Sequence, residues 1–411
     1  MKKSICVLLA LALFAGCLAA CAPEAALTDE QILQERRDIA EAHMRHMMGM
    51  LWQTDEDIVY STHPNSKGVE KDGEDRLIRL EAGKVYSGMP YTHGSGSAEG
   101  FLRFAQKDEN GIYQLSGMTA DHLNGYCGTT PFNVARISND CADAVSWAWS
   151  RVGSSFNFTQ TQNMTAERGC LKVGTYAFEG AVYTKTKDVV RENGEQVMYE
   201  AYACLQKADA VVSFNGEGHA MMVSQVHVEK NADAIDPEAS YVLVHEQFTA
   251  NYRNEVTYVD EATGKTVYCL GGVDRKYTFQ DLFKKTCVPI TIRELVDPAP
   301  VEPPDLVDSI KSPDITNLTR GAICCLYKIA LVTVTITDSQ GNIIQQATCF
   351  PKEAEHHMFR MECFEQDFEW PVSIGRLDVE SLTPGSYRCT VDCALGNGDV
   401  LTARDFDFTI Q

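Results

Sequence analysis

Residues Ser138 to Gly153 read SNDCADAVSWAWSRVG and place Cys141 directly after three polar residues. Ser, Asn and Asp all favour the position that begins a helix. The following apolar residues recur at intervals that let one side of a helix be buried: Ala142, Ala144, Val145, Ala148, Trp149 and Val152. The segment therefore predicts a helix that begins near Cys141 and packs against a sheet, with Trp147 and Trp149 in the core or lining a groove.

A cysteine at such a position has three interpretations. The N–H groups at a helix start favour the thiolate, which is the nucleophilic form of cysteine. Alternatively, Cys141 is half of a disulfide, with Cys127 as the nearest candidate. It can also be a small buried side chain, which is a common role for free cysteine.

A nucleophilic cysteine also needs a base, usually a histidine held by a third polar group. The stretches ADAVVSF, AMMVSQVHV and SYVLVHEQF predict three strands. His219 directly precedes the second stretch and His245 lies in the third, so these two are candidate bases, with His227 as a third candidate. Adjacent residues of a strand point to opposite faces, so only one of His245 and Glu246 can meet the His219 ring. The pattern favours Glu246, because a carboxylate also stabilises an imidazolium.

The order of these residues resembles the NlpC-type cell-wall peptidases and the related CHAP amidohydrolases, both papain-like. Asp140-Cys141 corresponds to the start of the NlpC-type Asp-Cys-Ser-Gly, Gly218-His219 opens an aliphatic strand, and VLVHEQ matches either an NlpC-type Val-Ile-His or a CHAP-type Val-x-Glu-Gln. Upstream, GMPYTHG with Tyr91 matches Gly-x-Pro-Tyr-x-x-Gly. The resemblance covers about Tyr86 to Phe248.

The chain departs from this family at two places. Ala142-Asp143 stands where the family has Ser-Gly, and the interval between Tyr91 and Cys141 is several times longer than usual. Either an insertion is accommodated there, or Tyr126 takes the place of Tyr91 near the oxyanion.

The resemblance implies a catalytic set of Cys141, His219, Glu246 or His245, and Tyr91. It also implies hydrolysis of amide bonds in the peptide part of peptidoglycan, with no cofactor. Two other classes remain open: a surface lipoprotein that uses the fold only for binding, and a cysteine protease or acyltransferase that acts on proteins or small amides.

The N-terminus predicts export. MKK followed by an apolar run is typical of a secretory signal. Leu18-Ala19-Ala20-Cys21 resembles the lipobox of bacterial lipoproteins, which implies a lipid on Cys21 and a membrane tether outside the cytoplasm. Of the fifteen cysteines, twelve remain after Cys6, Cys17 and Cys21, and none of their spacings matches a metal site.

The composition of the chain and its Pro-rich segment then predict the division into regions. We expect an α+β protein with a signal peptide (1–20), a lipid-anchored helix and spacer (21–54), a papain-like domain with a small antiparallel sheet (55–295), a Pro-rich linker (296–305) and an immunoglobulin-like β-sandwich (306–411). The helix prediction rests on the capping pair Thr28 and Gln31 and on Met44 to Met50 as a core-packing face. The linker has four prolines in ten residues. The net charge of −21 argues against nucleic acid as a partner.

Overall fold

The structure is a computed structural model of the chain. It describes residues 27–61, 77–92, 96–102, 105–123, 138–153, 161, 164–165, 169–179, 181, 184–216, 218–247, 256–318, 320–349, 358–360 and 377–411. The predicted signal peptide, Cys21, Tyr126 and Cys127 lie outside these ranges. Over the ranges described, no helix combines the length and the apolar character needed to cross a membrane.

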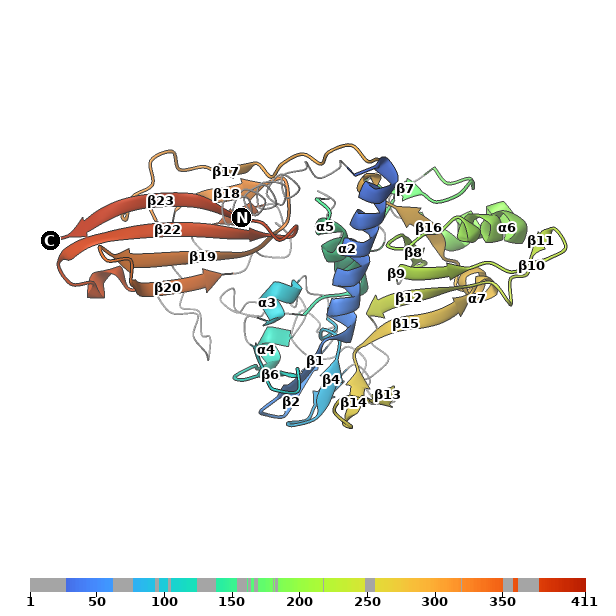
Figure 1. Cartoon of the computed structure of the whole chain (residues 1–411), viewed down its shortest axis with the longest axis horizontal. Helices are drawn as coiled ribbons and strands as arrows, with labels where there is room; N and C mark the ends of the chain where they lie inside the picture. The colour runs from blue at the N-terminus through green and yellow to red at the C-terminus, as the bar shows by residue number, and fades with distance from the viewer. Residues whose placement is uncertain are drawn as a thin grey trace, which may run out of the picture.

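Helix α2 (Asp29–Gly49) runs through the middle of the protein (Figure 1). The predicted capping box is present, since the Thr28 hydroxyl accepts from the Gln31 N–H and the Gln31 side chain accepts from the Thr28 N–H. Met44, Met47 and Met48 are fully buried in the main hydrophobic core, which confirms the core-packing face. Helix α2 is therefore part of the main core, while its role as a spacer from the membrane stays a prediction.

A six-stranded antiparallel sheet lies beside α2, in the order β15-β12-β9-β8-β16-β7 (Figure 1). Three of its strands confirm the stretches predicted from the sequence. The bounds are β7 Leu171–Lys172, β8 Ala210–Phe214, β9 Gly218–His227, β12 Tyr241–Gln247, β15 Gly271–Thr278 and β16 Val288–Thr291.

Helix α5 (Cys141–Ser150) is the helix predicted after Asp140, and all of its residues are buried. It packs between α2 and β9, and the Trp149 indole N–H donates to the Ala208 carbonyl at 2.8 Å. The other helices of this part are α3 Ala98–Leu102, α4 Ala120–Leu123, α6 Thr186–Ala203, which is interrupted at Gly194, α7 Phe279–Lys284 and the 3₁₀ turn η4 Arg293–Leu295.

A second six-stranded sheet, absent from the sequence prediction, has the order β13-β14-β4-β1-β6-β5. Its strands are only three or four residues long: β1 Leu51–Thr54, β4 Val85–Ser87, β5 Ala105–Lys107, β6 Tyr113–Leu115, β13 Thr257–Val259 and β14 Thr266–Cys269. Trp52 anchors it, since its indole N–H donates to the Gly88 carbonyl at 2.8 Å. Two smaller sheets of two antiparallel strands each are also described: β2 Ile58–Ser61 with β3 Leu77–Leu80, and β10 Lys230–Asn231 with β11 Ala234–Ile235.

The C-terminal part consists of two sheets around a separate core, as expected for a β-sandwich. One sheet contains β17 Leu306–Asp308, β18 Ala322–Cys325 and β21 Met358–Arg360, and the other contains β19 Ile329–Asp338, β20 Ile343–Cys349, β22 Gly385–Leu395 and β23 Val400–Ile410, with the 3₁₀ turn η7 Val379–Ser381 before β22. The buried guanidinium of Arg404 on β23 contacts both carboxylate oxygens of Asp308 on β17, at 2.6 and 2.9 Å, and so ties the sheets together. The overall class is mixed α and β, rich in sheet.

Candidate functional site

Cys141 is the first residue of α5, and Asp140 caps the helix. One Asp140 carboxylate oxygen accepts from the N–H groups of Ala142 and Asp143, both at 2.9 Å. Asp140 thus satisfies two of the N–H groups at the helix start but not that of Cys141. Cys141 is a free thiol with 4% of its surface exposed, at the end of the helix where the backbone dipole favours negative charge.

His219 and Glu246 come together on neighbouring antiparallel strands. Glu246 on β12 pairs with Met221 on β9, so His219, two residues before Met221, lies on the same face as Glu246. The His219 Nε2 atom is 2.7 Å from a Glu246 carboxylate oxygen, and the Cys141 side chain lies close enough to the same ring to help raise the pKa of His219. The three side chains form a chain from thiol to imidazole to carboxylate.

The electrostatics of this chain favour a charged imidazole. Burial disfavours the imidazolium, but the contacts with Cys141 and Glu246 outweigh burial and raise the pKa of His219 from 6.5 to about 10. For Glu246, burial favours the neutral acid, yet its hydrogen bond to His219 and the charge of His219 leave its pKa below the ordinary value. The geometry therefore supports an anionic Glu246 next to a cationic His219.

Two residues of β15, which the sequence analysis missed, also hold Glu246. The Tyr277 hydroxyl donates to one Glu246 oxygen at 2.7 Å, and the Arg275 Nε–H reaches the same oxygen at 2.8 Å. Residues 275 and 277 are two positions apart on a strand and so share a face. The spacing of Arg275 and Tyr277 indicates that they share a strand face, but nothing in the sequence predicts that β15 pairs with β12.

His245 lies on the opposite face of β12 and does not contact His219. Its Nε2 atom is 2.6 Å from Glu41 of α2, and its Nδ1 atom accepts from the Asp274 N–H at 3.2 Å. Burial lowers the pKa of His245, so the ring is neutral with its proton on Nε2. Of the two alternatives for the partner of His219, the structure places Glu246 there and uses His245 to attach α2 to the sheet.

The third candidate histidine, His227, lies at the far end of β9. It is 3.5 Å from Glu229 and stacks on the Tyr241 ring, eight residues along the strand from His219.

Tyr91 lies beside the segment that leads to Cys141. It forms an isolated parallel bridge with Asn139, and the Gln247 amide donates to the carbonyls of Met89 and Pro90 at 2.9 and 3.0 Å. The GMPY segment, the start of α5 and the end of β12 therefore meet at one place. The long interval between Tyr91 and Cys141 is accommodated, in its described part, by α3, β5, β6 and α4.

Asp143, one of the two departures from the family pattern, is fully buried and lies 3.5 Å from the ammonium nitrogen of Lys328. Lys328 belongs to the C-terminal part, immediately before β19, and is fully buried as well. Sequence reasoning missed this residue because 185 positions separate it from Asp143.

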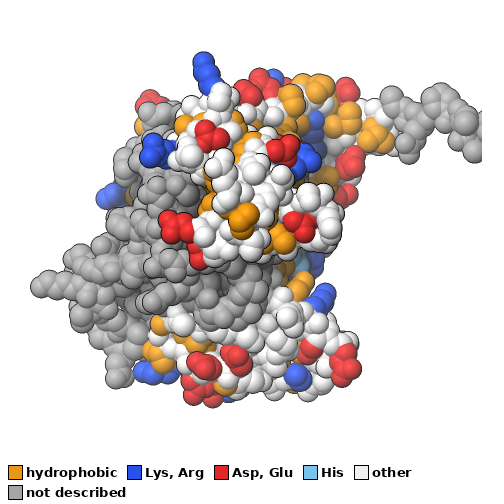
Figure 2. Space-filling view, turned by 90° about the vertical axis from the view of Figure 1, so that its left-hand side faces the viewer, with side chains coloured by type: hydrophobic (Ala, Val, Ile, Leu, Met, Phe, Trp, Pro, Cys, Tyr) orange, Lys and Arg blue, Asp and Glu red, His pale blue; other side chains and the backbone are white. Residues whose placement is uncertain are grey.

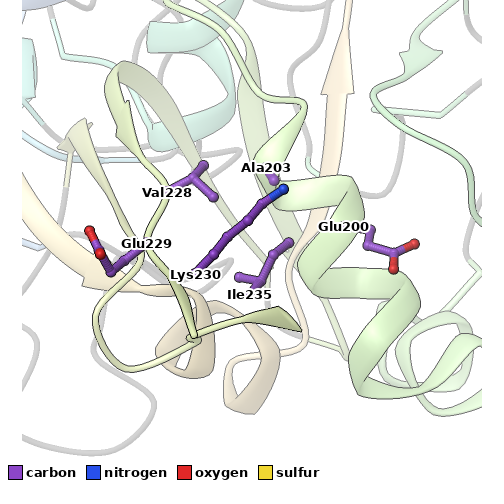
Figure 3. A pocket seen from close by; sticks show the side chains of 6 residues that line it. All are labelled: Glu200, Ala203, Val228, Glu229, Lys230 and Ile235. Carbon is purple, nitrogen blue, oxygen red and sulfur yellow. The ribbon is translucent and has the colours of Figure 1, made fainter. Parts of the chain in front are cut away.

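A surface pocket elsewhere is separate from these residues. Figure 3 shows Lys230 extending between the β10–β11 hairpin and the end of α6; the lining residues are Glu200, Ala203, Val228, Glu229, Lys230 and Ile235. The pocket begins where β9 ends, whereas His219 lies at the start of that strand. Among the residues that the structure describes, no three His, Cys, Asp or Glu side chains gather as metal ligands.

Comparison with known proteins does not identify a family for this chain. No family model matches the chain, and no curated protein matches it. A solved structure of a tetra-tandem repeat in the extending region of a large adhesion protein is similar at 13% identity, with a TM-score of 0.18, over 49% of this chain and 41% of that chain. A likeness of this size carries no argument about fold or function.

Proposed function

We propose that this protein is a cysteine hydrolase that cleaves amide bonds through Cys141, His219 and Glu246. The observation that supports it best is the order of thiol, imidazole and carboxylate, in which His219 hydrogen-bonds Glu246 and Cys141 lies next to the His219 ring. A helix start and two adjacent strands contribute the three side chains. The same order along the chain, with the nucleophile on a helix before an antiparallel sheet, supports a papain-like arrangement for this part of the protein.

The mechanism follows from these positions. The Cys141 thiolate attacks the amide carbonyl carbon, and the N–H of Cys141 stabilises the oxyanion. His219 gives its proton to the amine as the C–N bond breaks, which leaves a thioester on Cys141. Water then attacks the thioester with His219 as base, and the carboxylic acid product leaves a free thiol. Glu246 orients the ring and stabilises the imidazolium.

The substrate class rests on the resemblance and on the predicted export. We propose the peptide part of peptidoglycan, reached by a protein that is tethered through a lipid on Cys21 at the extracytoplasmic face of the membrane. Tyr91 is proposed to lie near the reacting carbonyl, because its segment borders Asn139. On the face in Figure 2, acidic side chains are spread among apolar and basic ones, and the charge of −21 makes an anionic polymer such as nucleic acid an unfavourable partner.

The test is hydrolysis of purified peptidoglycan, followed by mass spectrometry of the released fragments. Cys141→Ala and His219→Ala should each reduce release by at least about a thousandfold, because the nucleophile and its base act as a unit. Cys204→Ala is the matched control, since Cys204 is a free, exposed cysteine at the end of α6, and it should retain full activity.

A panel of folded and unfolded proteins, run with the same variants, separates the alternatives. Cleavage of proteins but not of peptidoglycan, dependent on Cys141, would make the protein a protease. Full activity in Cys141→Ala would refute the mechanism for either substrate.

A further inference from the structure

The C-terminal part is docked on the outer side of α5, the helix that carries Cys141. Asp143, Trp147 and Ser150 are spaced by four and three residues and so share one face of this helix. The Lys328 ammonium lies 3.5 Å from Asp143 and 4.5 Å from the centre of the Trp147 ring. Gly396 fits against the same face, where an added Cβ would come within 2.5 Å of the Ser150 hydroxyl oxygen.

Further contacts fix this docking. The Gly396 N–H donates to the Lys328 carbonyl at 2.8 Å, so the two docked residues hold each other. Arg151, directly after α5, donates to Glu99 at 3.0 Å and to the Gly396 carbonyl at 3.4 Å. Ala330, two residues after Lys328, is buried in the main core rather than in the sandwich core.

The linker is attached as well. Arg36 of α2 donates to the carbonyls of Glu294, Asp297 and Ala299 at 2.8 to 3.0 Å, and the Tyr327 hydroxyl donates to the Glu302 carbonyl. These bonds fasten the Pro-rich linker to the protein near both of its ends. The C-terminal part is therefore held in one place relative to Cys141.

The position of Lys328 matters because Cys141 has acidic neighbours. Asp140 immediately precedes it and Asp143 lies two residues after it, and both are buried, at 6% and 0% exposure. A buried carboxylate opposes a second negative charge nearby, so these residues disfavour a thiolate on Cys141. Lys328, from the C-terminal part, is a cation that contacts Asp143 of this pair.

We propose that Lys328 is a positioning residue for the reaction: its ammonium neutralises Asp143 at the first turn of α5 and allows Cys141 to ionise. This inference rests on the proposed function and makes the C-terminal part necessary for the reactivity of Cys141.

Other charged groups also face this region. His219 from β9 and Glu246 from β12 form one charged pair, and Arg151 with Glu99 forms another. His43 and His46 of α2 both have lowered pKa values, chiefly through burial, so neither supplies a cation near neutral pH. Burial lowers the pKa of Lys328 itself to about 8, with Asp143 opposing the shift, so the ammonium is charged at neutral pH.

The experiment measures the rate at which iodoacetamide alkylates Cys141 in the full chain as a function of pH. Mass spectrometry of the peptide that contains Cys141 separates it from the other free cysteines. Lys328→Met should raise the midpoint pH and slow alkylation at neutral pH about tenfold. Asp143→Asn should do the opposite, and Lys328→Arg should stay close to the wild type.

The opposite directions distinguish a charge effect from damage to the fold, because disruption of the interface would shift both variants alike. Removal of Lys328 takes a cation away from the buried Asp143 carboxylate, which can prevent folding. In that case the Asp143→Asn variant alone provides the test. Unchanged profiles in the folded variants, or shifts in the same direction, overturn the proposal.

The same measurement separates this inference from the proposed function. If alkylation of wild-type Cys141 follows an ordinary thiol profile and is unaffected by His219→Ala, the proposed function fails. If it depends on His219 but neither Lys328→Met nor Asp143→Asn shifts it, only the role of Lys328 fails.

Discussion

Replacing Glu246 with Gln should uncouple the imidazole from its counter-ion while leaving the site nearly the same size. Glu246 is 2% exposed and accepts from three groups, His219, Arg275 and Tyr277. A Gln has a single acceptor oxygen, so its NH₂ group must face at least one of these donors. Either the His219 ring then loses its charge-assisted hydrogen bond to residue 246, or Arg275 and Tyr277 both lose theirs.

The size of the effect follows from that bond. A hydrogen bond to a charged group contributes about 1.5–3 kcal/mol, and about 1.4 kcal/mol corresponds to one pKa unit. The pKa of His219, now raised to about 10, should therefore fall by about one to two units. Hydrolysis should slow by about 10- to 100-fold, since the imidazolium that protonates the amine is less stable.

Two measurements check this prediction: the pH titration of the His219 ring by NMR, and the rate of hydrolysis. The matched control is Glu229→Gln, which removes an exposed carboxylate beyond the far end of β9 and should change neither. An unchanged His219 titration in folded Glu246→Gln would refute the role assigned to this carboxylate.

Three further predictions concern stability and backbone fit. His245→Leu leaves the buried carboxylate of Glu41 without its 2.6 Å donor and should lower the free energy of unfolding by about 1.5–3 kcal/mol; in urea denaturation, stability equal to the wild type would contradict this. Because the pKa of His219 is raised from 6.5 to about 10, its protonation stabilises the fold fully below pH 6.5, and the stability advantage over His219→Gln should shrink between pH 6.5 and 10; a constant difference would argue against the raised pKa. Gly218→Ala should lower both the melting temperature and the activity, since the new Cβ would lie 2.6 Å from the Thr161 Cβ. Full activity in this variant would contradict the prediction, because the backbone around Gly218 would then adjust without displacing His219.

The elements around Cys141 could be predicted because local chemistry determines them. Asp140 is a strong N-cap, and the apolar residues behind Cys141 have helical spacing, so α5 begins where expected. The stretches AMMVSQVHV and SYVLVHEQF were sufficient to predict β9 and β12.

The choice between His245 and Glu246 could not be predicted from alternation alone. A period of two puts them on opposite faces without saying which face is which, and the register of β12 against β9 shifts between Leu243 and Val244. On the face of β12 that carries His245, the contacting side chain is Glu41 of α2, which lies about two hundred residues earlier in the chain.

The remaining surprises are also contacts between distant segments. The second sheet is built from strands of three or four residues, too short to give a periodic signal, and it pairs β4 with β14 across about 180 residues. Nothing in the sequence distinguishes Lys328 from any other charged residue that precedes a predicted strand. Only its burial against Asp143 connects it to the site.

The most direct test of the central claim is a search for an acyl group on the thiol of Cys141. The protein would be mixed with soluble stem peptides from purified peptidoglycan, and the reaction would be quenched in acid and digested. The mass of the peptide that contains Cys141 would then be measured by mass spectrometry. The mechanism predicts a thioester adduct with the mass of the acyl fragment in the wild type and none in Cys141→Ala. Hydrolysis that proceeds without an adduct, and at the same rate in Cys141→Ala, would contradict the assignment of Cys141 as the nucleophile.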